Sequence, residues 1–225
     1  MLFQIIRGAD IYDLIAYVFA MAFVVFCTLP IHEYAHALVA YKLGDSTAKN
    51  MGRMTISPMA HIDWIGALMI LLVGFGYAKP VPVNARNFKN PKLGMAVSAM
   101  AGPLSNILMA LLFLFGAQAV SHSVNESSVL WSAVYTFLYF AALVNVSLAV
   151  FNLIPIPQLD GSRVLNAVLP DKYYFKLMQY ERYIVLVVFV LLLTGVLSKP
   201  LSWISGIVFN ALNYVAALPF GGLLK

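Results

Sequence analysis

Charged side chains are scarce in this chain of 225 residues: Asp, Glu, Lys and Arg together make up only 10% of it, against about 25% in soluble globular domains. Hydrophobic residues account for 62% of the chain, and its mean hydropathy is +0.86. This composition excludes an ordinary soluble domain and predicts a protein of the lipid bilayer. Because the apolar stretches recur along the whole length, a removable signal peptide at one end does not account for them.

Cysteine and acidic residues are also rare. The single cysteine, Cys27, excludes a disulfide framework and a cysteine-based metal site. Any bound metal must therefore be held by histidine and carboxylate side chains. Nine acidic residues stand against 14 basic ones, a net charge of +5. Most of the basic residues lie in short segments between apolar runs, which is typical of topology signals, so we expect no nucleic-acid partner.

The apolar runs predict an all-α polytopic membrane protein with about five to six transmembrane helices. The predicted spans are residues 11–43, interrupted at Pro30, and residues 93–120, 129–153, 183–197 and 201–218. A shorter run, residues 64–77, either crosses the membrane or is re-entrant. We expect one intramembrane domain over residues 1–225, with a catalytic core at about 11–170 and a C-terminal helical pair at about 181–218.

The segment from Asp45 to Asp63 is polar and contains alternating β-branched residues. This pattern predicts a short strand or a small membrane-associated β-hairpin, beside the possible re-entrant segment 64–77. An exposed strand edge there, near Thr55, could accept an unwound substrate as an added strand.

Loop charges predict the orientation of the chain. The segment KPVPVNARNFKNPK carries four basic residues and no acidic one, whereas SHSVNESS contains Glu126 and no Lys or Arg. By the positive-inside rule, the first segment is cytoplasmic and the second faces outward.

The sequence HEYAH, residues 32–36, concentrates two of the four histidines and one of the nine acidic residues in an apolar helix. The i, i+4 spacing places His32 and His36 on one helix face, where both can bind one Zn²⁺. Glu33 lies beside them and can act as a general base without being a ligand. Ionisable groups at membrane depth cost about 2.5–3.5 kcal/mol each and need a function or a partner. The alternative is a buried cluster that hydrogen-bonds neighbouring helices.

Catalytic zinc sites usually have a third protein ligand. Asp160 stands out because it follows a span end broken by Pro155 and Pro157, where irregular backbone is tolerated if it lines a cavity. The alternative is that Asp160 is the N-cap of a short helix from Gly161 to Leu169. The other acidic candidates are Asp45, Asp63, Glu126, Asp171 and Glu181.

HEYAH on one predicted helix and NLIPIPQLDG at the end of a later one resemble the paired signature of the site-2 protease family. The segments GRMTISPMAHIDWIG, GFGYAKPVPVN and AGPLSN are similar to stretches of the compact bacterial and archaeal members, so the resemblance covers roughly residues 28–170. It implies one Zn²⁺ per chain, held by His32, His36 and Asp160, with Glu33 as the catalytic base. It also implies that Asn152 assists the oxyanion or holds the substrate. The chain departs from the family's LDGG ending, because Ser162 occupies the second glycine position.

The resemblance implies a zinc-dependent intramembrane endopeptidase that cleaves transmembrane substrate proteins within or near the bilayer. We expect a multi-pass protein of the prokaryotic inner or plasma membrane, with its active site toward the cytoplasmic side. Compact members of this kind have no PDZ or CBS domain, so substrate choice would rest in the membrane core or in a partner protein. Whether the protein works with an adaptor, and whether it forms a homo-oligomer, both stay open.

Two other functions stay open at this point. In the first, the chain is a membrane zincin of the prenyl-protein-processing type, with Glu126 or Glu181 as third ligand. In the second, it is a metal-binding membrane transporter or scaffold without protease activity. Of the remaining polar residues, Asn106 is expected to pack helices or bind substrate, and His61 to form a structural hydrogen bond.

Overall fold

The computed structural model describes residues 11–73, 79–123 and 128–221. Within these ranges the chain forms helices and no strand. The elements in chain order are α2 (Ile11–Phe23), the π-helical turn η1 (Val24–Thr28), α3 (Leu29–Lys42), α4 (Thr47–Asn50), α5 (Pro58–His61), α6 (Trp64–Val73), the 3₁₀ turn η2 (Ala85–Asn87), α7 (Pro91–Ser123), α8 (Val129–Asn152), α9 (Asp160–Val168), α10 (Asp171–Gln179), α11 (Glu181–Leu193), α12 (Ser198–Ala217) and the 3₁₀ turn η3 (Leu218–Phe220).

Four helical stretches among the described residues are long and apolar enough to cross a membrane: Leu14–Lys42, Pro91–His122, Val129–Asn152 and Ser198–Phe220. The all-helical class is as predicted, but this number is lower than the predicted five to six. The helices α6 and α11 have 10 and 13 residues. At 1.5 Å per residue they reach about 15 and 20 Å, short of a hydrocarbon core of about 30 Å. The end of the predicted segment 64–77 lies outside the described residues.

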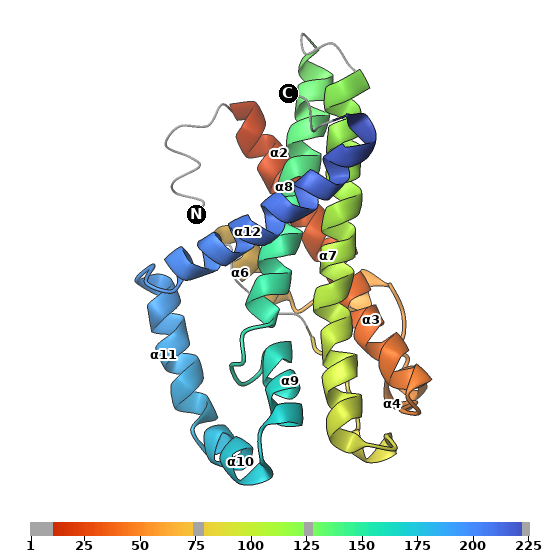
Figure 1. Cartoon of the computed structure of the whole chain (residues 1–225), viewed down its shortest axis with the longest axis vertical. Helices are drawn as coiled ribbons and strands as arrows, with labels where there is room; N and C mark the ends of the chain where they lie inside the picture. The colour runs from red at the N-terminus through yellow and green to blue at the C-terminus, as the bar shows by residue number, and fades with distance from the viewer. Residues whose placement is uncertain (1–10, 74–78, 124–127, 222–225) are drawn as a thin grey trace.

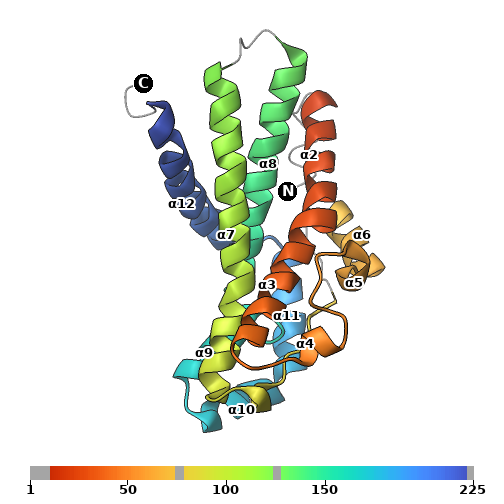
Figure 2. The ribbon, with the colours of Figure 1, turned by 90° about the vertical axis from the view of Figure 1, so that its right-hand side faces the viewer.

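The first long stretch runs through α2, η1 and α3 as one continuous helical path (Figure 2). The sequence predicts an interruption at Pro30, and the structure instead has a single π-helical turn just before it, with Pro30 in the first turn of α3. Proline has no N–H to donate to the preceding turn, and a local change of helical pitch accommodates this loss. The path therefore reaches HEYAH without a break.

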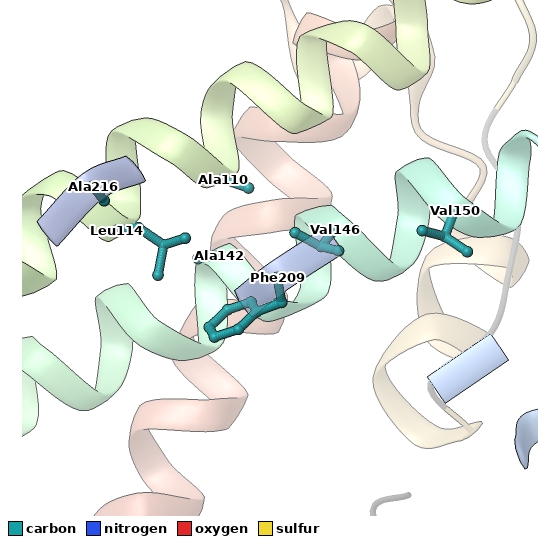
Figure 3. Packing of buried hydrophobic residues seen from close by; sticks show 7 residues of the cluster. All are labelled: Ala110, Leu114, Ala142, Val146, Val150, Phe209 and Ala216. Carbon is teal, nitrogen blue, oxygen red and sulfur yellow. The ribbon is translucent and has the colours of Figure 1, made fainter. Parts of the chain in front are cut away.

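The helices α7 and α8 run side by side along the length of the molecule, and α12 crosses them (Figure 1). Their shared core is made mostly of small and medium apolar side chains, with one phenylalanine (Figure 3). It comprises Ala110, Leu114, Ala142, Val146, Val150, Phe209 and Ala216. Small residues let helix backbones approach closely. In a membrane, van der Waals packing and not the hydrophobic effect drives the association of helices. The Gln118 amide also donates a 2.9 Å hydrogen bond to Asn213 Oδ1, which ties α7 to α12.

The β-hairpin predicted between Asp45 and Asp63 is not confirmed. This segment forms the short helices α4 and α5, joined by turns. Its backbone groups are paired locally: Arg53 N donates to Ala48 O at 2.8 Å, and His61 Nε2 donates to Thr55 O at 2.7 Å. There is consequently no strand edge at Thr55 for a substrate to extend.

The lower end of the molecule in Figures 1 and 2 gathers α3, α4, α9 and α10 around the start of α7. There α7 packs against both α3 and α9. This packing brings HEYAH close to the segment that follows α8, although the two are far apart in the sequence.

Candidate metal centre

The helix α3 places His32 and His36 one turn apart with their rings facing the same space. Their Nε2 atoms are 3.0 Å apart, and the two rings meet edge to face with centroids 4.6 Å apart. Both side chains are buried. The i, i+4 geometry predicted from the sequence is therefore present, with both Nε2 atoms converging.

Asp160 comes from the other side of this space. It is the first residue of α9, and its Oδ2 lies 3.3 Å from His32 Nε2 and 3.2 Å from His36 Nε2. The N-cap of α9 is Leu159, so the carboxylate faces the imidazoles and does not cap the helix. Burial raises the pKa of the Asp160 carboxyl, but hydrogen bonds from the two histidines outweigh burial and hold it below its usual range. Asp160 is thus held as a carboxylate.

The turn before α9 is packed too tightly for any residue but glycine after Asp160. A Cβ on Gly161 would overlap the carbonyl oxygens of Leu153 and Ile154. Ser162, the departure from the family's ending, is buried and donates a 2.8 Å hydrogen bond to Leu159 O. The serine therefore fits here and helps to fix the turn that carries Asp160.

The ring of His36 is oriented by the backbone of α7. Its Nδ1 lies 2.7 Å from the carbonyl oxygen of Ser98. A carbonyl can only accept, so Nδ1 carries a proton. In the neutral imidazole, Nε2 then has a lone pair that a metal ion can accept. Partners of this kind fix the tautomer and orientation of metal-ligating histidines.

Gly102 lets α7 approach both imidazoles. A Cβ at this position would overlap His36 and would lie 2.6 Å from His32 Cε1. Any larger residue at position 102 would enter the space in which the three donor atoms converge.

Glu33 lies beside the cluster and is buried. Its Oε2 accepts a 2.9 Å hydrogen bond from the backbone N–H of Val81. Val81 belongs to the predicted basic loop before α7, so the acidic side chain of HEYAH is anchored to a segment almost fifty residues away.

The other acidic residues that the sequence offered as a third ligand have different partners. Asp171 pairs with Lys92 at 2.8 Å, and Glu181 accepts a 3.0 Å hydrogen bond from Gln158. Asp45 and Asp63 accept backbone N–H groups, and Glu126 lies outside the described residues. In the part of the chain that the structure describes, one group of three side chains could hold a metal ion: His32, His36 and Asp160.

Three further residues were singled out from the sequence. Asn152 is the last residue of α8, and its amide donates to Leu148 O of the same helix at 3.0 Å. His61 is fully buried and forms the expected structural hydrogen bond, to Thr55 O. Asn106 is 2% exposed, and its Oδ1 has no hydrogen-bond partner among the described residues.

Sequence reasoning missed the supports of the cluster. Ser98 and Val81 act through backbone atoms, which leave no signature in the side chains. Gly102 carried a weak signal, since a glycine followed by a proline inside an apolar span indicates close approach of backbone.

Comparison with known proteins indicates which family this chain resembles. Residues 117–195 match the family model described as "Peptidase family M50". This stretch includes Asn152 and Asp160, whereas HEYAH lies before it. No solved structure matches the chain significantly.

Three relatives extend the match toward the N-terminus. A Bacillus subtilis protein named "Putative zinc metalloprotease YwhC" is 39% identical over 164 residues, which cover 72% of this chain and 75% of that protein. "Putative zinc metalloprotease Rip2" of Mycolicibacterium smegmatis is 28% identical over 177 residues, or 76% of this chain and 66% of the relative. "Zinc metalloprotease MJ0392" of Methanocaldococcus jannaschii is 30% identical over 148 residues, or 66% of this chain and 34% of the relative. With its four candidate spans, this multi-pass membrane protein belongs to peptidase family M50, the site-2 protease family.

Proposed function

We propose that the chain is a zinc-dependent intramembrane endopeptidase that hydrolyses peptide bonds of transmembrane substrate proteins within or near the bilayer. One observation carries the proposal: His32 Nε2, His36 Nε2 and Asp160 Oδ2 converge beside the buried Glu33. The two histidines lie in a helical stretch long and apolar enough to span a membrane. Membership of family M50 and the names of the relatives support the same function.

The three donor atoms fit a zinc ion. Zinc binds histidine nitrogen at about 2.0–2.1 Å with tetrahedral geometry, which places neighbouring ligand atoms about 3.3 Å apart. The observed separations are 3.0, 3.3 and 3.2 Å. Two imidazoles and one carboxylate are also a typical ligand set for catalytic zinc, with a fourth position left for water or substrate. His32, His36 and Asp160 would therefore hold one Zn²⁺ per chain.

The zinc ion, when bound, would supply Lewis-acid chemistry by making water acidic near neutral pH and by polarising the peptide carbonyl. Glu33 would act as general base and then general acid. Its Oε2 is held by the Val81 N–H, which leaves Oε1 to take a proton from the attacking water. As the C–N bond breaks, Glu33 returns this proton to the leaving amine nitrogen, so hydrolysis yields a carboxyl group and an amine.

Asn152 is proposed as an assisting residue for the oxyanion or the substrate. It lies at the end of α8, eight residues before Asp160, and is half-buried. One N–H of its amide is donated to Leu148 O, and an amide has a second N–H to offer.

The active site is proposed to lie near the cytoplasmic face of the prokaryotic cell membrane. His32 and His36 lie in the C-terminal half of the Leu14–Lys42 stretch. The neighbouring segments carry mainly basic residues, which are Lys42, Lys49, Arg53, Lys79, Arg86, Lys89 and Lys92. By the positive-inside rule, such segments face the cytoplasm.

Cleavage in liposomes tests this proposal. The purified chain is reconstituted with a single-span reporter protein, and the products are mapped by mass spectrometry. We expect a cut within or at the edge of the reporter's span, its loss after treatment with a zinc chelator, and its return on addition of Zn²⁺. Cleavage that resists the chelator, or that occurs only far from the bilayer, would contradict the proposal. Zinc binding without any cleavage would favour the transporter or scaffold.

A further inference from the structure

The loop before α7 makes the only described hydrogen bond to the Glu33 carboxylate. Val81 N–H lies 2.9 Å from Glu33 Oε2. The Val81 side chain is 4% exposed and packs in a small cluster with Ala37 of α3 and Ala48 of α4. Val81 thus contacts α3 twice, through its N–H at Glu33 and through its side chain one helical turn further on.

The sequence of the loop suits the presentation of one N–H group. Pro80 and Pro82 flank Val81, and neither proline has a backbone N–H. Proline also restricts the residue before it to extended conformations. Within these three residues the Val81 N–H is therefore the single backbone donor, held on a stiff stretch of chain.

The far end of this loop is fixed by Asp45, which is 1% exposed. Its Oδ2 accepts a 2.7 Å hydrogen bond from Asn84 N, and its Oδ1 accepts one of 2.7 Å from Asn87 Nδ2. The backbone N–H and the hydroxyl of Thr47 also donate to Oδ1. Asp45 therefore joins the start of α4 to the loop through an ionised acceptor, and hydrogen bonds of this kind are stronger than neutral ones.

Local geometry brings Asp45 against the loop. It follows Gly44, which ends the turn after α3 with a φ of +110°, a conformation that favours glycine. A Cβ on Gly44 would lie 3.3 Å from Asn87 O. The near end of the loop is held separately, by hydrogen bonds from Lys79 N to His61 O at 2.8 Å and from Arg53 Nη2 to Lys79 O at 2.9 Å.

We propose that Asp45 is a positioning residue for Glu33. It fixes the loop from Lys79 to Asn87, and the loop in turn holds the Glu33 carboxylate through Val81 N–H. The inference rests on the proposed function, in which Glu33 moves the proton. It assigns to Asp45 a role in catalysis, although the described hydrogen bonds of the Asp45 carboxylate are with Thr47, Asn84 and Asn87 and not with the three proposed metal ligands.

We expect release of the loop to lower kcat. A displacement of about 1 Å in a reacting group can cost about 100-fold in rate. Release of the loop would leave His32, His36 and Asp160 in place, because their described contacts with one another and with α7 do not involve the loop. We therefore expect Asp45→Ala to lower kcat by about tenfold to 100-fold, with KM and zinc content close to those of the wild type.

Two further variants distinguish a loss of Glu33 positioning from a general loss of stability. Asn87→Ala removes one of the loop contacts of Asp45 at an exposed site, so it should fold and should lower kcat in the same direction by less. Asp63→Ala is the matched control, because Asp63 also accepts two backbone hydrogen bonds, from Ile65 N and Gly66 N at 3.0 Å each. Its described bonds cap α6 and do not reach the loop. We expect Asp63→Ala to leave kcat within about twofold of wild type, as surface caps act on stability.

Hydrogen exchange tests the positioning without reliance on cleavage. In the tripeptide Pro80–Val81–Pro82 only Val81 has an amide hydrogen to exchange, so single-residue exchange there reports directly on the bond to Glu33. We expect faster Val81 exchange in Asp45→Ala and in Asn87→Ala than in wild type, and unchanged exchange in Asp63→Ala.

The outcomes are distinct. Faster Val81 exchange and a lower kcat in Asp45→Ala, with zinc retained, support the inference. Unchanged Val81 exchange in a folded Asp45→Ala overturns it, whether or not the wild type cleaves the reporter. A fall in zinc content equal to the fall in kcat also overturns it, since the effect would then pass through the metal ligands. Failure of the proposed function shows differently, as a wild type that binds zinc and cleaves nothing.

Discussion

His36 Nδ1 lies 2.7 Å from the carbonyl oxygen of Ser98, so a backbone atom of α7 orients one of the two histidines of HEYAH. The same helix brings Gly102 against both imidazoles one turn later. The geometry of the candidate metal centre therefore depends on the packing between α3 and α7 as well as on the HEYAH sequence. Side chains on the adjoining face of α7 have to leave this space open.

The first prediction concerns Gly102. In Gly102→Ala the added Cβ would overlap His36 and His32, and we expect zinc affinity to fall by about tenfold to 100-fold, as for other changes next to metal ligands. Gly206→Ala is the matched control, since a Cβ at Gly206 in α12 meets no atom within 4 Å. Zinc competition with a chelating dye measures both variants. Equal zinc affinity in the two would contradict the close packing of α7 against the histidines.

The second prediction concerns the third ligand. Asp160→Ala removes one of the three donor atoms, and we expect loss of stoichiometric zinc together with loss of cleavage. Asp171→Ala removes an aspartate that pairs with Lys92 on the surface and should retain both. Elemental analysis of the purified variants gives the zinc content. If Asp160→Ala kept a full zinc ion, a different third ligand would be required, and the prenyl-protein-processing type of site would regain support.

The third prediction is a pH dependence of stability. Burial raises the pKa of the Asp45 carboxyl, but hydrogen bonds from Thr47, Asn84 and Asn87 outweigh it and hold the pKa below its usual range. A group whose pKa is lowered by folding stabilises the fold above its unfolded pKa of about 3.9 and loses this contribution as the pH falls toward the folded value. Wild type should therefore exceed Asp45→Ala in Tm by a constant margin above about pH 5, and this margin should shrink below about pH 4. Thermal unfolding in detergent from pH 7 to pH 3 measures it, and a margin that persists to the lowest pH would contradict the role given to the Asp45 hydrogen bonds.

The sequence predicted the arrangement of the candidate site better than the contacts that surround it. The spacing of His32 and His36 fixes their relation because both lie on one helix, where local geometry decides. Asp160 was recognisable as a polar residue at a broken span end. The contacts from Ser98 and Val81 were not predictable, since they depend on how α7 and the preceding loop pack against α3, and backbone atoms are common to all residues.

Two parts of the fold prediction, the hairpin and the number of spans, are not confirmed. The alternating residues around Thr55 suggested a hairpin, but the backbone there is paired locally, since Arg53 N donates to Ala48 O and His61 Nε2 donates to Thr55 O. The apolar run 183–197 suggested a full span. Its helix α11 ends at Leu193, followed by Gly195 with a φ of +77°, a left-handed turn that stops a helix.

The most direct test of the central claim compares zinc content and reporter cleavage in wild type and Glu33→Gln. Glu33 is not among the three proposed metal ligands. Glutamine keeps an oxygen that can accept from Val81 N–H, but it cannot take up a proton at neutral pH. The account predicts about one zinc per chain in both proteins, with cleavage by the wild type alone. Equal cleavage by the two proteins would contradict the role of Glu33 as the catalytic base, and zinc in both without cleavage by either would contradict the assignment as a protease.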